Sequence, residues 1–154
     1  MRALIDALFV RISRQMAANE PIFTSNVDLD RFAGEILGGS RASGSYTAQQ
    51  VYNALEAGVN RWVANQSFGG ETMDAGLARM ADLLKALPTQ TLRAQEKDEL
   101  QQYSTPPSYA MLAAYALSAE PGENLLEPSA GTGSLLAMAD SIYGEKLHSE
   151  YANE

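Results

Sequence analysis

The spacing of apolar residues in the first part of the chain predicts a series of α-helices. Apolar residues recur with helical periodicity in four stretches, at residues 3–16, 29–37, 51–63 and 73–87. Pro88 ends the last stretch, because a proline cannot continue helical hydrogen bonding. The interpretation we favour is that the apolar faces pack on one another as a helical domain over residues 1–95. The alternative is that one of these faces binds a partner protein.

Residue types that begin and end helices lie at the edges of these stretches. Asp28 is expected to cap the second helix, which ends at Gly38-Gly39. Thr47 and Gln50 have the spacing of a capping box for the third helix, in which each side chain bonds the other residue's backbone. We expect that helix to end at Gly69-Gly70.

Beyond residue 100 the pattern changes to helix, strand, turn, helix, strand. Pro106-Pro107 suits the first turn of a helix, which we expect to end at Pro121-Gly122. Next come a short strand at 124–127, a turn at 128–133, a helix at 134–143 and a strand at 147–153. This order is typical of the start of a doubly wound, Rossmann-like α/β fold. The predicted fold class is therefore a mainly α region followed, over residues 96–154, by the truncated start of such a fold.

The composition excludes several classes of protein and site. The 154 residues are 45% hydrophobic and 19% charged, as in soluble globular proteins. No apolar run reaches the roughly 20 residues of a membrane-spanning helix, so we expect no membrane partner. The absence of cysteine excludes disulfides and thiolate metal sites, and fits a cytoplasmic location. His148 is the sole histidine, and we assign it no role.

The net charge of −8 arises entirely in the C-terminal part of the chain. Residues 1–95 carry nine acidic and nine basic groups, whereas residues 96–154 carry ten acidic groups and two basic ones. Binding to nucleic acid depends largely on neutralising phosphates, and the sequence has no basic patch for it. Arg2, Arg11 and Arg14 share one predicted helix, where they either touch nucleic acid or, as we favour, form a solvated face.

The turn at 128–133 has the residue types that let backbone approach a ligand. Gly131 and Gly133 lack side chains, and the N-terminus of the next helix offers N–H groups to an anion. The turn lacks the G-K-[ST] end of a phosphate-binding loop, which disfavours a nucleotide-binding enzyme. It also departs from G-x-G-x-x-G, with Leu136 at the third glycine position. Glu154 lies 21 positions after Gly133, near the spacing at which an acidic residue binds ribose; Glu150 is the weaker choice.

Two segments here resemble N6-adenine-specific DNA methyltransferases, which use S-adenosylmethionine (SAM). L-L-E-P-S-A-G-T-G-S-L-L at 125–136 resembles their SAM-binding motif, and Q-Q-Y-S-T-P-P-S-Y-A at 101–110 resembles the segment that precedes it. The two segments in the right order are far more specific than either alone. The resemblance covers the last third of the chain. A weaker resemblance is to large phage- or plasmid-borne proteins that join such a methylase module to a strawberry-notch-like helicase region.

The resemblance implies a role for each residue of the motif. Thr105 and Pro106 would hold the methionine end of SAM. Glu127 would face the methionine amino group, with Pro128 closing the first strand. Glu154 would bind the ribose. The loop beneath the cofactor would consist of Ser129, Ala130, Gly131, Thr132 and Gly133.

The catalytic motif of that family is absent from the sequence. These enzymes hold the target amine with [N/D/S]-P-P-[Y/F/W], whereas the one Pro-Pro pair here is preceded by Thr105 and followed by Ser108. We therefore expect an N-terminal fragment that binds SAM, reaches DNA only through other parts of a parent protein, and transfers no methyl group by itself. The alternative is a short mobile-element protein that acts through a protein partner, as a regulator or an inhibitor of host defence. An incomplete sheet edge also predicts self-association.

Overall fold

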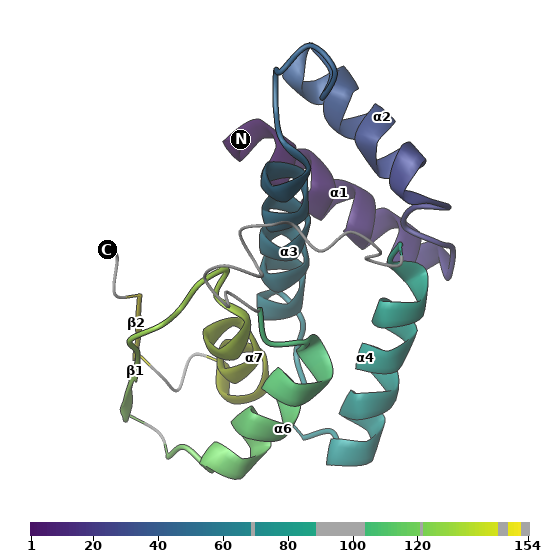
Figure 1. Ribbon diagram of the computed structural model, residues 1–154. Helices are drawn as coiled ribbons and strands as arrows, with labels where there is room; N and C mark the ends of the chain where they lie inside the picture. The colour runs from purple at the N-terminus through teal and green to yellow at the C-terminus, as the bar shows by residue number, and fades with distance from the viewer. Residues whose placement is uncertain (69, 89–103, 121, 145–147, 152–154) are drawn as a thin grey trace. The chain divides into compact units, whose positions relative to one another are not determined.

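The computed structural model describes residues 1–68, 70–88, 104–120, 122–144 and 148–151 (Figure 1). The chain is mainly helical, which confirms the prediction from the apolar pattern. Its elements are α1 (Arg2–Ala18), α2 (Asn26–Leu37), α3 (Ala48–Ala64), α4 (Met73–Ala86), α6 (Pro107–Leu117), β1 (Asn124–Glu127), α7 (Ser134–Tyr143) and β2 (His148–Tyr151).

The chain divides into two compact units, each made of two separate segments of the sequence. The first unit comprises Met1–Val59 and Lys85–Tyr103, and the second comprises Asn60–Leu84 and Ser104–Glu154. The end of α3 and most of α4 therefore belong with the segment that resembles a methyltransferase. Apolar periodicity could not reveal this, because it shows which face of a helix is buried and not which element covers it.

The core of the first unit is built on the apolar face of α1. Leu4, Leu8 and Ile12 are fully buried, one helical turn apart. Gly58 of α3 lies against this face, and a Cβ added at Gly58 would come within 3.0 Å of the Leu8 Cβ. The burial of these residues supports the interpretation of the α1 stripe as core.

Helix ends match the sequence where the signal is strictly local. The capping box is confirmed: the Thr47 N–H donates to Gln50 Oε1 at 2.9 Å, and the Gln50 N–H donates to Thr47 Oγ1 at 3.1 Å. The cap predicted for α2 was wrong, because Ser25 is the N-cap and its side chain accepts from the Asp28 N–H. Helix α2 ends at Gly38 with a left-handed φ of 74°, as predicted.

Helix α3 ends at Ala64, before the two glycines that we expected to stop it. Two side-chain amides bond backbone carbonyls in its last turn: Asn65 Nδ2 donates to the Arg61 carbonyl at 2.7 Å, and Gln66 Nε2 donates to the Trp62 carbonyl at 3.1 Å. The Asn65 N–H also donates to both carbonyls, at 3.3 Å to Arg61 and 3.1 Å to Trp62, so backbone and side chains together close the helix end. The chain then turns, and Phe68 is fully buried.

The second unit is organised around Phe68 and the connection that leads into α4. The Phe68 N–H donates to the Ser141 carbonyl of α7 at 2.8 Å, and the Arg79 guanidinium lies 4.2 Å from the Phe68 ring centroid. Arg79 also bonds Glu71 at 2.6 Å, and the Tyr115 hydroxyl of α6 donates to the Glu71 carbonyl at 3.2 Å. The connection therefore contacts both α6 and α7.

Helix α7 lies between α6 and the strand pair (Figure 1). Strand β1 pairs with β2 in parallel, with Leu126 opposite Glu150 and Glu127 opposite Tyr151. The described residues thus form one strand–helix–strand unit with a two-stranded sheet, which is fewer strands than a doubly wound sheet contains. Leu126 is 71% exposed on β1.

Candidate functional site

The turn that joins β1 to α7 is the candidate site. Residues 124–127 are extended, as predicted, and 128–133 form consecutive turns before α7 begins at Ser134. Both glycines of the turn adopt left-handed conformations, with φ of 53° at Gly131 and 85° at Gly133. Side chains disfavour this region, so the turn has the backbone path for which glycine is needed.

Most of the turn faces solvent. Pro128, Ser129 and Gly131 are exposed, Ala130 and Thr132 are half-buried, and only Gly133 is buried. At Gly131, an added Cβ would meet a single atom within 4 Å, the Ser129 carbonyl oxygen at 3.9 Å. The backbone around Gly131 is therefore accessible to a ligand.

Glu127 at the end of β1 stabilises the start of the turn. Its Oε1 accepts hydrogen bonds from the Ser129 N–H at 2.9 Å and from the Ser129 hydroxyl at 2.8 Å. Within the described part of the chain, Oε2 of the same carboxylate has no hydrogen bond. The Glu127 side chain thus stabilises the turn through Oε1, and Oε2 is left to accept a hydrogen bond from a ligand.

The N-terminus of α7 follows the turn directly. Gly133 is its N-cap, and none of the described side chains caps it. The Gly133 N–H donates to the Ala130 carbonyl at 2.7 Å, which closes the turn, and the Ala137 N–H donates to the Gly133 carbonyl at 2.9 Å. The first N–H groups of a helix have no intrahelical partner, and they attract anions.

Thr105 and Pro106, the other residues expected to contact SAM, lie at the start of α6. Pro106 is the N-cap of α6 and Pro107 its first residue, which confirms the expected use of the proline pair. Thr105 is half-buried and Pro106 exposed. Helix α6 packs against α7, but no hydrogen bond among the described residues links Thr105 or Pro106 to the turn. Glu154, the expected ribose ligand, lies outside the described residues.

Asn60 on α3 is a contact of the turn that sequence reasoning missed. Its side chain is bonded to Thr132 and to Ser134, 72 and 74 residues further along the chain. A signal did exist, because Asn60 is an amide next to Val59 and Trp62, which both lie on the apolar face of α3. The sequence gives no means of finding its distant partners.

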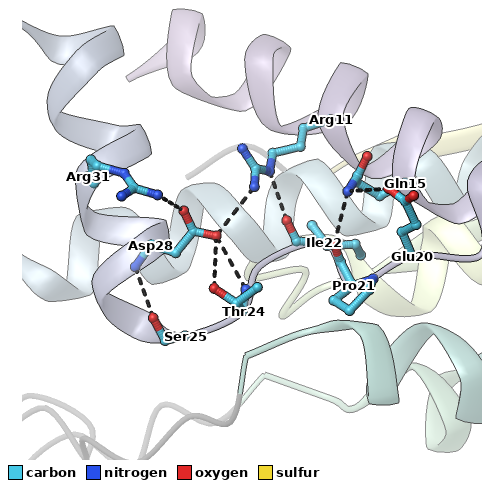
Figure 2. Close-up of polar contacts among 9 residues, drawn as sticks. All are labelled: Arg11, Gln15, Glu20, Pro21, Ile22, Thr24, Ser25, Asp28 and Arg31. Carbon is cyan, nitrogen blue, oxygen red and sulfur yellow. Dashed lines mark hydrogen bonds and ion pairs between the residues drawn. The ribbon is translucent and has the colours of Figure 1, made fainter.

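A second polar cluster, on α1 and α2, has a structural role. The Asp28 carboxylate bonds Arg31 at 2.5 Å, Arg11 at 3.4 Å and the Thr24 N–H at 3.3 Å (Figure 2). Burial raises the pKa of Asp28, but the Thr24 N–H and the Arg31 and Arg11 guanidiniums outweigh it, so the pKa lies below its ordinary value of 3.8. The cluster joins α1 to the start of α2.

Arg11 makes contacts within the first unit and is not simply part of a solvated face. Its Nε donates to the Ile22 carbonyl at 2.8 Å, as Figure 2 shows, and its guanidinium lies 4.3 Å from the centroid of the Phe23 ring. The same guanidinium lies 5.1 Å from the centroid of Phe32. The side chain is 30% exposed. Arg2 and Arg14 are exposed, as expected for a solvated face.

A small pocket in the first unit is a weaker candidate. Its lining includes Asp30, Arg41 and Tyr52. Asp30 and Arg41 form an ion pair with each other, so their charges are already compensated. Burial raises the pKa of the Tyr52 phenol, which keeps the phenol neutral. The pocket therefore offers no uncompensated charge to a ligand.

Neither a cluster of metal ligands among the described residues nor a match to a known protein bears on the candidate site. Among these residues, no group of acidic and histidine side chains gathers as metal ligands do, and no helix has the length and hydropathy to cross a membrane. The chain matches no protein-family model, no curated protein and no solved structure.

Proposed function

We propose that the turn at 128–133 and the start of α7 bind SAM, and that this chain is the cofactor-binding part of an adenine-specific DNA methyltransferase. The observation that carries the proposal is the conformation of the motif. The segment that resembles the SAM-binding motif consists of a strand, an exposed turn with two left-handed glycines, and a helix without a side-chain cap. With β2 it makes a parallel strand–helix–strand unit, the order in which a Rossmann-like fold would begin.

The charges of this site are complementary to the methionine end of SAM. SAM carries a carboxylate, an ammonium and a sulfonium. The carboxylate would be placed at the first N–H groups of α7, where the helix dipole favours an anion. The ammonium would pair with Oε2 of Glu127, since Oε1 is bonded to Ser129.

The remaining contacts with SAM are proposed from the resemblance to adenine-specific DNA methyltransferases. Thr105 and Pro106 would close over the methionine end, because α6 packs against α7. Glu154 would bind the ribose hydroxyls, since it follows Tyr151, the residue paired with Glu127, by three positions. The carboxyl ends of parallel strands lie at one edge of a sheet, so β1 and β2 would direct the turn and the ribose ligand to the same side.

No methyl transfer is expected from these 154 residues. The sequence holds no [N/D/S]-P-P-[Y/F/W] segment to hold an extruded adenine. The proline pair that comes nearest is used to start α6. DNA binding and catalysis would need residues that this sequence does not contain.

Calorimetric titration with SAM and with its demethylated product tests the proposal. Glu127→Gln is the informative variant, because a glutamine oxygen can still accept the Ser129 bonds while the charge that would pair with the ammonium is lost. Charge-assisted hydrogen bonds contribute roughly 1.5–3 kcal/mol, so we expect SAM affinity to fall about ten- to a hundredfold. Glu123→Gln is the matched control: its carboxylate accepts from the Glu120 N–H at 2.9 Å, just before β1, and its loss should leave affinity unchanged.

Two results would contradict the proposal. The first is no heat of binding with either ligand at millimolar concentration, which would leave a protein–protein role as the better account. The second, turnover of labelled SAM on adenine-containing DNA, would contradict the expected lack of methyl transfer and show that the catalytic groups are present in another form.

A further inference from the structure

The Asn60 side chain bonds the residues on both sides of Gly133, the last residue of the turn. Its Nδ2 donates to the Thr132 carbonyl at 2.7 Å and approaches Thr132 Oγ1 at 3.3 Å. Its Oδ1 accepts from the Ser134 hydroxyl at 3.3 Å. Thr132 and Ser134 flank Gly133, so one amide spans the step from turn to helix.

The amide is held firmly by its surroundings. Asn60 is 7% exposed, and only it and Ser141 are buried polar residues in the described part of the chain. Burying an amide is unfavourable unless its donor and acceptor are both bonded. The contacts with Thr132 and Ser134 meet that requirement, which ties the side chain to the turn.

These bonds restrain the backbone around Gly133, which would otherwise change conformation easily. Gly133 has a φ of 85°, and glycine enters and leaves this region at little cost. With both neighbours bonded to Asn60, the direction of the first N–H groups of α7 relative to the turn is fixed before any ligand arrives. Fixing a site in advance raises affinity, because less ordering remains to be done on binding.

We propose that Asn60 is a positioning residue for the cofactor, holding Thr132 and Ser134 in the arrangement that accepts SAM. The inference rests on the proposed function of the turn. It adds a residue from the helical part of the chain, outside the segment that resembles a methyltransferase, to the binding machinery.

The test compares SAM affinity in Asn60→Leu, which has a similar size and no hydrogen bonds, with affinity in Ser141→Ala. Ser141 is the matched control, because its hydroxyl donates within α7 to the Met138 carbonyl at 2.7 Å and leaves the turn untouched. Calorimetry well below the unfolding temperature should show SAM binding at least tenfold weaker in Asn60→Leu and within twofold of the original chain in Ser141→Ala. Loss of stability alone would not separate the two variants in this way.

A second variant and a spectroscopic readout guard against an Asn60→Leu protein that does not fold. Ser134→Ala removes one of the bonds and should weaken SAM binding about two- to tenfold, as expected for one hydrogen bond. In spectra recorded without ligand, the amide resonances of Gly131 and Gly133 should shift in Ser134→Ala and not in Ser141→Ala.

The outcomes separate this inference from the proposed function. If the original chain binds SAM and both Asn60→Leu and Ser134→Ala bind it equally well, Asn60 is not a positioning residue and the proposed function stands. If the original chain binds neither SAM nor its demethylated product, both proposals are overturned together.

Discussion

Removing the charge of Asp28 should lower stability by an amount that depends on pH. Asp28→Asn keeps an oxygen for the Thr24 N–H but loses the ion pairs with Arg31 and Arg11. Arg31 is 70% exposed, so its pair contributes at most about 1 kcal/mol. Arg11 is 30% exposed against an Asp28 side chain that is 12% exposed, and its bond is worth more in this partly buried setting. We expect a loss of about 1–2 kcal/mol in the free energy of unfolding at pH 7.

The sign of the pH dependence follows from the lowered pKa of Asp28. A carboxyl whose pKa is lower in the folded state than in the unfolded state stabilises the fold above its ordinary value of 3.8. That stabilisation is lost as the pH falls through the lower, folded value. The difference between the original chain and Asp28→Asn should therefore be largest near neutral pH and shrink in strong acid.

Urea unfolding followed by circular dichroism, repeated from about pH 7 down to about pH 2, measures this difference directly. Glu35→Gln is the control, since Glu35 is exposed on the same helix and undergoes the same change of charge. It should leave the free energy of unfolding within about 0.5 kcal/mol of the original at every pH. An Asp28→Asn effect that was equally large at the two ends of the range would refute the electrostatic reasoning.

Three further substitutions test the local structure of the second unit. Gly133→Ala forces a side chain onto a φ of 85° and should cost about 1–2 kcal/mol in thermal unfolding while weakening SAM binding; unchanged values of both would show that the turn is not held as described. Leu126→Ala should change the free energy of unfolding by less than about 0.5 kcal/mol, because Leu126 is 71% exposed. The same change at Leu136, which is 3% exposed, should cost about 2–5 kcal/mol, and equal losses at the two leucines in urea titrations would contradict the burial pattern.

The helices could be predicted from sequence because their signals are local. Periodic apolar residues, the Thr47–Gln50 pair and the Gly38 cap each act within one helix. The cap of α2 could not be settled in this way, because Ser25 and Asp28 are both capping types three positions apart. In the structure the Ser25 side chain accepts from the Asp28 N–H, and the Asp28 carboxylate is bonded to Thr24, Arg31 and Arg11 instead.

The candidate site was predicted only as far as its motif is continuous in sequence. The strand, the two glycines and the start of α7 follow one another, so their order suggests their geometry. The Asn60 contact crosses 72 residues, and no short pattern encodes it. The same limit applies to the two compact units, because residues 60–84 are grouped with a segment that follows them only after residue 103.

Backbone amide spectra recorded during titration with SAM test the central claim most directly. The account predicts shifts concentrated at Ser129, Gly131, Thr132 and Ser134, with Gly38 and Gly44 of the first unit unchanged. Shifts centred instead on the pocket beside Tyr52, or no shift in the turn at millimolar SAM, would contradict the claim that this turn binds the cofactor.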